Sequence, residues 1–544
     1  MQVVQPVHRR QHDLAARVIE FLGDHAIGVA IGTVTIIIAF LTLGSSLVVD
    51  GTRYFWLDDD QMVSMRYARN LASGNGFVWN PGERVEGYTS FGWALVMAGV
   101  HLLPLSDATM SLAVKIVSWL LACATIVLTD RLLRRFVPRP GLTRLAVLLT
   151  LALCVDLLFW AANAFETTLL TAVFLVGMLR VLDDAERESP RIATFLSIGL
   201  LPLARSDAFH LWGALIVVAL AIHQDRLRVA RLLPTAVVLP ILHLVFRRWY
   251  YGAWLPNTYY LKVAGIPGLF WGGAGYLKSF VEAYSVPVLL TAGGALWAGD
   301  RRLRYVAAGA LVTAAYVLTV GADNFPYSRF LAPWVPVLLV LGAAAAWQLS
   351  GGAVRARGLL VAALAIVTTI QSGVHGRTTL QLRSGNGTPE HGLVVGLMIR
   401  DNTRPDARVA VTAAGNVPYF SRRPAVDLLG KADAHVARLP PHAMGPIGHK
   451  KFDMDYSLSL HPDLVVTFLT SSFGASPESA AYVRSAAGQH DYRVALFTSR
   501  VFADEYRGQP IPLPYLLERG AVYVRRSSPE AQSLDSWRMP AIGR

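Results

Sequence analysis

The sequence predicts an α-helical polytopic membrane protein, with about eleven transmembrane helices, followed by a C-terminal α/β extracytoplasmic domain. Two observations carry this prediction. Of 544 residues, 53% are hydrophobic and 16% are charged, and apolar runs near the length that crosses a bilayer recur up to residue 375. Beyond residue 376 the apolar runs shorten to the length of strands, which indicates a mixed α/β domain.

The net charge of +13 does not indicate nucleic acid as a partner. In a membrane protein such an excess is typical of basic cytoplasmic loops next to anionic headgroups. The two cysteines, Cys123 and Cys154, lie inside apolar runs, where packing is the simpler interpretation than a disulfide or a metal site. The first apolar run, 27–49, is long for a signal peptide and lacks a small-residue cleavage site, so we expect a retained span.

The arginine distribution sets the predicted topology. The polar tail 1–26 carries three arginines and is expected in the cytoplasm, so span 27–49 leads outward. If the next run, 89–104, also crossed, span 109–130 would return outward and place the arginines of 131–135 outside, against the positive-inside rule. That run is also short for a span. We therefore expect 89–104 to lie in the outer interface and 109–130 to be the second span.

With this choice the later arginine-rich loops are all inside and the C-terminus is outside. The membrane domain then covers 27–375, with a first outer loop at 50–108, and the outer domain covers 376–544. The further spans are expected at 144–162, 167–183, 191–204, 208–222, 233–250, 284–299, 305–321, 330–349 and 358–374.

The outer loops hold polar residues that folding does not require. They are Asp58 to Glu86, Asn163 to Glu166, Arg205 to Asp207, Pro256 to Lys262 and Asp323 to Arg329. A solvated rim is one explanation, but ionisable groups at a membrane are costly and usually functional, which favours a working cavity on the outer face. Asp156 lies within a span, where it either pairs with an arginine or points into the bundle.

Three carboxylates, Asp58, Asp59 and Asp60, stand where the first span leaves the membrane. One interpretation is an acidic cap on a juxtamembrane helix, since Asp is common at helix N-termini. Three in a row exceed what a cap needs, because their mutual repulsion makes it costly to ionise them all. Such a cluster favours a bound cation, an abstracted proton, or both. In a helix that begins here, Arg66 lies roughly on the face of Asp59.

The outer domain has four strand-length runs and two helical patterns. The runs are 409–412, 464–467, 494–497 and 521–524, and the helical patterns are 390–402 and 477–488. There is no P-loop, no Gly-x-Gly-x-x-Gly after a strand and no CxxC in the sequence, so an importer driven by its own ATPase is not expected.

These features suit the transfer of a sugar from a lipid-linked phosphate donor. The acceptor hydroxyl needs a general base, which a carboxylate supplies. The leaving phosphate needs positive charge, either from basic side chains or from a divalent cation held by carboxylates. The candidate phosphate ligands are Arg205, Lys262, Arg329, His449 and Lys451. For each one the alternative is a side chain that snorkels to the headgroups.

The first outer loop also resembles a known family. Its pattern Asp59-Asp60-x5-Arg66-x2-Arg69-Asn70, continued by Asn80-Pro81-Gly82 and Glu86, is similar to that of the mycobacterial terminal β-arabinofuranosyltransferases and their bacterial GT-C relatives. The resemblance extends over most of the chain. It recurs at Tyr251-Gly252 with Leu255-Pro256 and Lys262, at Gly321-Ala322-Asp323 with Arg329, at Asp427-x2-Gly430 and at Gly448-His449-x-Lys451.

The resemblance implies a GT-C fold and a polyprenyl-phosphate arabinofuranose donor used at the outer face of a bacterial plasma membrane. The acceptor would be a cell-envelope glycan or glycoconjugate. It also implies that Asp59 and Asp60 form the acidic motif, with Asp59 the catalytic residue. The remaining site residues are then expected to bind substrate, and these are Arg66, Glu86, Arg205, Lys262, Asp323, Arg329, His449 and Lys451. A divalent cation (Mg, Mn or Ca) on Asp59 and Asp60 is a possible cofactor.

The sequence departs from the family at three places. Asp58 precedes the usual pair, Arg205-Ser206-Asp207 replaces Arg-Pro-Glu, and the C-terminal domain is short. These departures leave the sugar and the acceptor open, so a transferase for another pentose or a hexose is the alternative. A transporter of a lipid-linked sugar is the alternative from another class. It is disfavoured because transporters typically show internal repeats, and none is visible in this sequence.

Overall fold

The structure is a computed structural model. It describes Phe21 and residues 23–138, 141–297, 299–323, 325, 327–385, 388–442, 448–467, 485, 490–510, 521–533 and 536–543. The chain divides into two compact units. We call Met1–Leu43, Lys115–Leu242 and Gly268–Leu382 the helical unit. We call Gly44–Val114, His243–Pro267 and Arg383–Arg544 the composite unit, because three separate stretches of sequence build it.

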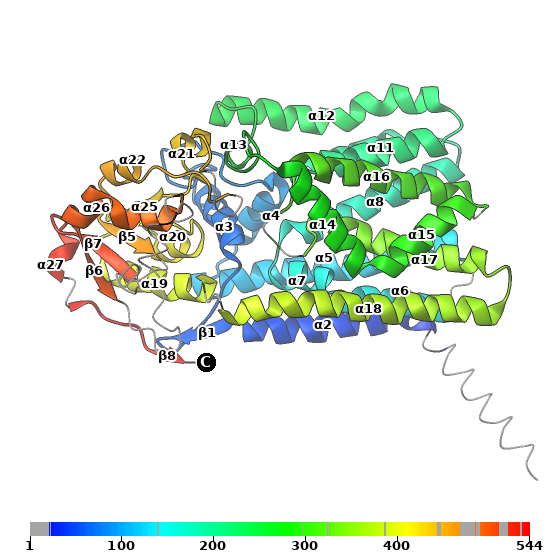
Figure 1. Cartoon of the computed structure of the whole chain (residues 1–544), viewed down its shortest axis with the longest axis horizontal. Helices are drawn as coiled ribbons and strands as arrows, with labels where there is room; N and C mark the ends of the chain where they lie inside the picture. The colour runs from blue at the N-terminus through cyan, green and yellow to red at the C-terminus, as the bar shows by residue number, and fades with distance from the viewer. Residues whose placement is uncertain are drawn as a thin grey trace, which may run out of the picture. The chain divides into compact units, whose positions relative to one another are not determined.

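The helical unit consists of helices in the part that the structure describes. They are α2 (Ala26–Gly44), α6 (Gly141–Leu153), α7 (Val155–Ala162), α8 (Glu166–Glu186), α9 (Ile192–Gly199), α10 (Leu201–Ala204), α11 (Phe209–Ile222), α14 (Leu269–Ala283), α15 (Ser285–Trp297), α16 (Arg301–Val320), η1 (Ala332–Trp334), α17 (Val335–Leu349) and α18 (Val354–Gly385). Two long helices, α5 (Asp107–Phe136) and α12 (Arg226–Tyr251), contribute residues to both units. Figure 1 shows α2, α16 and α18 running roughly parallel.

Every segment that the sequence predicts as a span contains a helix, although 46–49 of the first one form strand β1, and fewer than eleven meet the length and composition of a membrane span. Among the described residues, 6 helices are long and apolar enough, and 8 if two bent helix pairs each count once. The expected spans at 167–183, 191–204 and 208–222 correspond to α8, α9 with α10, and α11, which are not among these 8. The structure therefore supports a polytopic helical membrane protein with 6 to 8 candidate spans.

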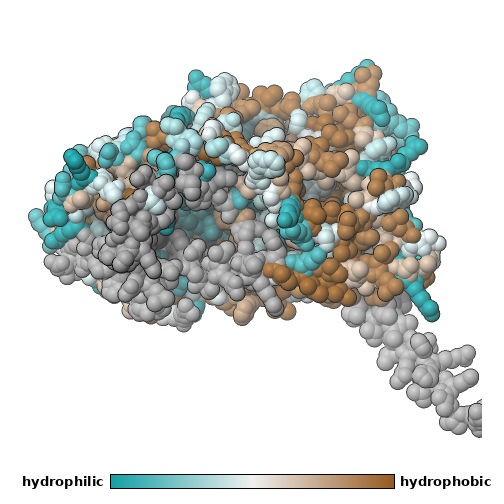
Figure 2. All heavy atoms as spheres, viewed as in Figure 1, coloured by the Kyte–Doolittle hydropathy of each residue, from teal (hydrophilic) through white to brown (hydrophobic). Residues whose placement is uncertain are grey.

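Apolar side chains cover both the interior and the surface of the helical unit. Helix α17 lies in its centre, with 83% of its span buried. Helices α2 and α18 expose large apolar side chains instead, such as Phe40 at 76% and Leu359 at 73%. Figure 2 shows hydrophobic residues gathered over much of this unit's visible face. A helix that is apolar on its outward side is expected where the solvent is lipid.

Two helices break inside the helical unit, and polar side chains bridge the breaks. Helices α6 and α7 meet at 49°, and α14 and α15 meet at 93°. Tyr284, at the second break, donates a hydrogen bond to Asp156, just after the first. The backbone N–H of Val155, freed by the break, donates to Ser372 Oγ at 2.9 Å. The sequence left open whether Asp156 pairs with an arginine or points into the bundle. In the structure it is buried in the bundle and its partner is a tyrosine.

Helix α8 separates two groups of charged side chains. Glu166, its first residue, lies near Arg205 and Arg329, whereas Glu186, near its other end, pairs with Arg135 and Arg302. With 21 residues at about 1.5 Å each, α8 is roughly 30 Å long. Three helix ends that the predicted topology assigns to one side of the membrane thus share ion pairs.

The composite unit opens with a small antiparallel sheet in the order β2-β1-β8. Its first two stretches also contain the helices α3, α4 and α13. Helix α4 is too short to cross a bilayer. The bounds are β1 (Ser46–Val49), β2 (Thr52–Phe55), β8 (Ile542–Gly543), α3 (Asp59–Ala72), α4 (Phe91–His101) and α13 (Asn257–Lys262). The expected interfacial segment 89–104 is thus a helix of 11 residues.

The C-terminal stretch forms a mixed sheet in the order β4-β3-β5-β7-β6. Strands β4, β3 and β5 are parallel, whereas β7 and β6 are antiparallel to their neighbours. The strands are β3 (Val409–Val411), β4 (Ala425–Asp427), β5 (Leu464–Thr467), β6 (Tyr506–Pro510) and β7 (Ala521–Arg525). The helices are α19 (Thr388–Asn402), α20 (Asn416–Ser421), α21 (Ala434–Arg438), α22 (Met454–Ser459), α25 (Tyr492–Thr498), α26 (Arg500–Glu505) and α27 (Glu530–Ser533). The expected α/β character is confirmed.

One predicted strand is wrong. Residues 494–497 belong to helix α25 because Asp491 caps its N-terminus, accepting a hydrogen bond from Arg493 N at 2.9 Å. The predicted helix 390–402 is α19, and the predicted helix 477–488 lies outside the described residues apart from residue 485.

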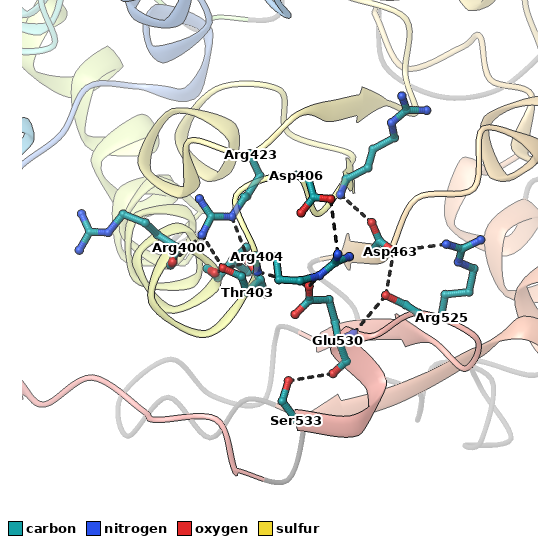
Figure 3. Close-up of polar contacts among 12 residues, drawn as sticks. Arg400, Thr403, Arg404, Asp406, Arg423, Asp463, Arg525, Glu530 and Ser533 are labelled. Atoms are coloured by element: carbon teal, nitrogen blue, oxygen red, sulfur yellow. Dashed lines mark hydrogen bonds and ion pairs between the residues drawn. The ribbon is translucent and has the colours of Figure 1, made fainter.

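Charged side chains join strand ends of this sheet to α27 and to the loop after α19 (Figure 3). Asp463 accepts from Arg408 N at 2.9 Å and pairs with Arg525 at 3.2 Å. Arg404 pairs with Glu530 at 3.0 Å. These contacts tie strand ends to loops and form a structural network of the composite unit.

The topology makes a testable prediction. A reporter fused after Arg135 is expected to read cytoplasmic, and one fused after Gly376 is expected to read outside, because the loops bearing Arg135, Glu186 and Arg302 share ion pairs. Dual reporters of opposite compartment preference provide the measurement. An outside reading at Arg135 contradicts the predicted topology.

Candidate functional site

The three carboxylates stand at the start of α3 in the composite unit. Asp58 is the N-cap, and its Oδ1 accepts a hydrogen bond from Asp60 N at 3.1 Å. The cap interpretation therefore holds for Asp58. Asp59 and Asp60 make different contacts, each with a segment more than 350 residues further along the chain.

Asp59 binds the start of helix α20. Its carboxylate accepts from the backbone N–H of Gly415 at 3.1 Å and of Asn416 at 2.8 Å. Gly415 passes so close that an added Cβ would lie 2.0 Å from the Asp59 carbonyl oxygen, so only glycine fits there. These contacts fix the orientation of the Asp59 side chain.

Asp60 forms an ion pair with Lys431. Lys431 follows strand β4 in a turn where Asp427 accepts from Leu429 N at 3.0 Å and Ala432 N at 2.6 Å. Gly430 has φ 79°, a left-handed conformation that favours glycine. Asn257 donates to the carbonyls of Gly430 and Lys431, at 2.9 and 3.1 Å, and holds the turn from the other side. The motif Asp427-x2-Gly430 was noted from the sequence, whereas Lys431, directly after it, was not predicted.

Burial and mutual repulsion shift the acidity of this group. Burial, followed by the charge of Asp60, raises the pKa of Asp58 to about 7. Burial also raises the pKa of Asp59, against the opposing charge of Lys431. Burial disfavours the charged form of Lys431, but Asp60 and Asp59 outweigh it and raise the pKa of Lys431. With one ammonium among three carboxylates, the group has a proton to exchange near neutral pH.

The predicted divalent cation does not fit the donors as they are arranged. Within the described residues, no group of three or more His, Cys, Asp and Glu side chains converges to hold a metal ion. Asp59 accepts from backbone amides, and Asp60 pairs with the ammonium group of Lys431. The cation remains a prediction from the sequence.

Arg66 lies buried, with its guanidinium bonded to backbone and amide oxygens. Its Nε donates to Trp79 O at 2.7 Å, and its Nη2 donates to Asn80 Oδ1 at 2.7 Å and Arg423 O at 2.9 Å. Its Nη1 donates to Pro418 O. These contacts favour an anchoring role over the predicted contact with substrate.

Glu86 pairs with Arg247 through two parallel contacts of 2.5 and 3.0 Å. Burial raises the pKa of Glu86 to about 6, although Arg247 opposes the shift. The neighbouring Tyr67 donates to Val85 O at 2.6 Å and accepts from Gly87 N at 2.8 Å. This loop is therefore fixed from both sides, and Glu86 positions it. Arg247 was not found by sequence reasoning, because it lies 161 residues away.

The remaining predicted residues of the composite unit are Lys262, in α13, and His449 and Lys451. Lys451 is buried, and its Nζ donates to the carbonyls of Tyr260, Ala437 and Ala264, at 2.8, 3.2 and 3.4 Å. Burial lowers the pKa of Lys451. Lys262 is the last residue of α13, and the ring of His449 lies 6.1 Å from that of Tyr492. Lys451 therefore anchors loops, like Arg66.

A second charged group lies in the helical unit. Arg205 pairs with Asp207 at 2.8 Å, Arg329 pairs with Asp323 at 2.8 Å, and Glu166 lies 3.7 and 3.9 Å from the two arginines. Arg205 also lies over the ring of Phe330. The structure thus brings together Arg205, Asp323 and Arg329, as the sequence predicts, and adds Glu166 and Asp207. Buried ion pairs of this kind are costly to desolvate and are typical of functional sites.

Known proteins are similar to parts of this chain in sequence. A family model described as "Domain of unknown function (DUF8728)" matches residues 380–510. The terminal beta-(1->2)-arabinofuranosyltransferase of Corynebacterium glutamicum is 28% identical over 357 residues, which are 56% of this chain and 50% of that protein. The enzyme of the same name from Mycobacterium tuberculosis is 31% identical over 256 residues, 43% of this chain and 40% of that protein. The chain thus spans about half the length of these relatives.

Two crystal structures share the fold. ArnT from Cupriavidus metallidurans bound to undecaprenyl phosphate aligns with a TM-score of 0.53 and 12% identity, over 92% of this chain and 98% of ArnT. The apo form aligns with a TM-score of 0.53 and 14% identity, over 91% and 97%. The expected homology to terminal arabinofuranosyltransferases is confirmed, and so is a polytopic helical fold similar to that of ArnT.

The raised pKa of Asp58 predicts a stabilising substitution. Because folding raises this pKa from about 4 to about 7, the folded state holds a proton that the unfolded state has lost, and the free energy of unfolding falls as the pH rises through this range. Asn caps a helix as well as Asp does. Asp58→Asn is therefore expected to raise the melting temperature at pH 8 more than at pH 5.

Asp491→Asn is the matched control, since Asp491 also caps a helix but pairs with Arg493 at its own helix start. It is expected to show no gain at pH 8. An equal change for Asp58→Asn at both pH values contradicts the raised pKa.

Proposed function

We propose that this chain is a GT-C glycosyltransferase that transfers a sugar, D-arabinofuranose, from a polyprenyl-phosphate donor to a cell-envelope glycan or glycoconjugate at the outer face of a bacterial plasma membrane. The observation that carries the proposal is the acidic group at the start of α3. It lies within the stretch whose pattern resembles the arabinofuranosyltransferases, it is held in place by the C-terminal stretch, and burial raises the pKa values of Asp58 and Asp59.

The reaction needs one proton acceptor and one stabilised leaving group. The acceptor hydroxyl attacks the anomeric carbon of the donor sugar, the base takes the hydroxyl proton, and the bond from the anomeric carbon to the phosphate oxygen breaks. The electron pair leaves with the polyprenyl phosphate. A carboxylate with a raised pKa is a better base than an ordinary one, because its basicity is matched to the working pH.

Asp59 is the proposed base, and Asp60 supports it. The two backbone amides that donate to Asp59 fix its orientation. Lys431, which pairs with Asp60, places a positive charge nearby. Asp58 is the alternative base, because its pKa of about 7 suits the role. Its side chain also accepts the hydrogen bond from Asp60 N that caps the helix. The order of damage among the three substitutions decides between them.

Arg205 and Arg329 are the proposed ligands of the donor phosphate. Arginine holds its charge and can bind a phosphate through two parallel N–H groups. Both arginines share Glu166 and each has its own aspartate, so the two guanidinium groups are fixed before a donor binds. ArnT, whose fold is similar, has been crystallised with undecaprenyl phosphate, which supports a polyprenyl-phosphate donor for this chain.

The alternative is a transferase with the same donor lipid and another pentose or a hexose. Nothing in the acidic group selects arabinofuranose, and the relatives align with this chain over half their length or less. A transporter of lipid-linked sugar is a further alternative. Homology to transferases disfavours it.

Substitutions in the acidic group test the proposed chemistry. Asp59→Asn is expected to lower turnover by about a hundred- to ten-thousandfold, the usual cost of a lost general base. Asp60→Asn should cost less and Asp58→Asn least. The measurement is sugar transfer by the purified full chain from a panel of polyprenyl-phosphate sugars, at matched melting temperature.

Near-normal turnover by Asp59→Asn contradicts its catalytic role, and the largest loss at Asp58 transfers that role to Asp58. Addition of a chelator tests the predicted cation. Loss of turnover that a divalent ion restores supports it, whereas indifference to the chelator supports a base without a metal.

Arg329 tests the proposed phosphate contact. Arg329→Ala is expected to raise the KM for the donor by about tenfold or more, because a charge-assisted contact is lost. Arg329→Lys should recover part of this loss, since the charge remains but the paired N–H groups do not. The matched control is Arg302→Ala, an arginine of the same unit that is also paired with an aspartate, at 3.0 Å. An unchanged KM in Arg329→Ala removes this residue from the site.

A further inference from the structure

A pocket of about 510 Å³ lies within the composite unit, at the C-terminal end of α3. We call it the basic pocket. Its lining includes Arg66, Arg69, His101, Asp107, Arg422 and Arg423. Helix α3 runs from the acidic group toward this pocket, and Arg66 and Arg69 of the lining lie roughly 9 and 14 Å along it from Asp60, at about 1.5 Å per residue. The lining contains none of the three carboxylates of the acidic group, so the pocket is a different site from the one proposed for sugar transfer.

The pocket has four arginines and a single carboxylate in its lining. That carboxylate, Asp107, pairs with Arg422 at 2.7 Å. The buried Arg423 donates to neutral oxygens, which are the carbonyls of Arg400 and Thr403, each at 2.6 Å, and the hydroxyl of Thr403 at 3.0 Å (Figure 3). Arg66 is likewise bonded to neutral oxygens. The positive charge of the lining thus exceeds its negative charge.

Arg69 contributes its guanidinium group to this excess of positive charge in the lining. Its Nη1 donates to Tyr419 O at 2.8 Å, and the group lies 4.3 Å from the centre of the Tyr419 ring. Burial lowers the pKa values of Arg69 and Arg66. His101 is held by Met97 O and by the Tyr419 hydroxyl, and burial lowers its pKa too, so it adds no charge at neutral pH. An anion in the pocket would offset the excess of positive charge in its lining.

Part of the pocket's lining is apolar and lies beside a candidate span. Leu105 and Met110 belong to the lining. The loop that joins α4 to α5 exposes Leu102 at 73% and Leu103 at 52%. Asp107 is the first residue of α5, a helix long and apolar enough to cross a membrane. Exposed leucines beside a basic cavity at the start of a span are typical of a site at the headgroup level of a bilayer.

We propose that the basic pocket binds the phosphate of an anionic membrane lipid, with Arg69 and Arg422 as its ligands and the exposed leucines of 102–105 in contact with the acyl chains. Charge complementarity selects an anionic headgroup over a zwitterionic one, and the apolar part of the lining selects a lipid over a free phosphate. A lipid bound here fixes the C-terminal end of α3 at the membrane surface. It contributes to placing the acidic group without taking part in transfer.

The test is native mass spectrometry of the purified full chain with phosphatidylglycerol, with phosphatidylcholine, or with inorganic phosphate. The wild type is expected to retain phosphatidylglycerol at least about tenfold more than phosphatidylcholine, and to lose little of it to inorganic phosphate. Arg69→Gln with Arg422→Gln should lower retention about tenfold, because two charge-assisted contacts are lost. The matched control is Arg493→Gln, since Arg493 is also partly exposed and paired with an aspartate in this unit.

A gain-of-binding variant guards against misfolding. Asp107→Asn removes the one carboxylate of the lining and frees Arg422, so phosphatidylglycerol retention is expected to rise severalfold. Unfolding would lower it instead. Equal retention of phosphatidylglycerol by the wild type, the double variant and Asp107→Asn overturns the proposal. Displacement of the lipid by inorganic phosphate at comparable concentration also overturns it, in favour of a free anion.

Discussion

The buried guanidinium group of Arg66 is the interaction on which the composite unit depends. It joins three parts of the chain that are far apart in sequence: helix α3 itself, the loop at Trp79 and Asn80, and the segment from Pro418 to Arg423. A buried charge is tolerated only where hydrogen bonds replace its water, and here oxygen acceptors surround it. Removal of the side chain would leave several carbonyl groups unsatisfied at once, whereas removal of a surface arginine leaves none.

The same principle organises the acidic group. Asp59 and Asp60 reach the segments around Gly415 and Lys431, so the first loop and the C-terminal stretch become one unit through α3. Asn257 adds the third stretch by holding the turn that carries Lys431. Placement of the three carboxylates therefore depends on contacts from all three stretches. A change in any one of them alters the acidity of the group as well as its position.

The sequence predicted those features that local pattern determines. A helix start at the acidic stretch 58–60 was one interpretation of the sequence, and the strands β3, β5 and β7 followed from short apolar runs. The run at 494–497 is also short and apolar, but the cap at Asp491 makes it a helix, and strand propensity did not weigh that cap. Lys431, Arg247 and Gly415 were missed because their partners lie 371, 161 and 356 residues away, and spacing along the chain carries no information about such pairs. Arg66 and Lys451, both predicted to bind substrate, donate to carbonyl groups of neighbouring loops, and a buried arginine or lysine looks the same in sequence whether it binds a phosphate or a carbonyl group.

An acidic helix cap was the competing interpretation of this stretch, and the structure supports it for Asp58 alone. A helix start has room for one capping side chain, and Asp58 takes that place. Asp59 and Asp60 lie in the first turn, where the helix dipole favours negative charge. That benefit is small beside the cost of three neighbouring carboxylates, and burial raises the pKa values of Asp58 and Asp59 despite Lys431. A cap optimised for stability alone would not retain two further acids in so costly a place. Buried carboxylates with raised pKa values and a fixed orientation suit a general base, which supports the proposed catalytic role of this group.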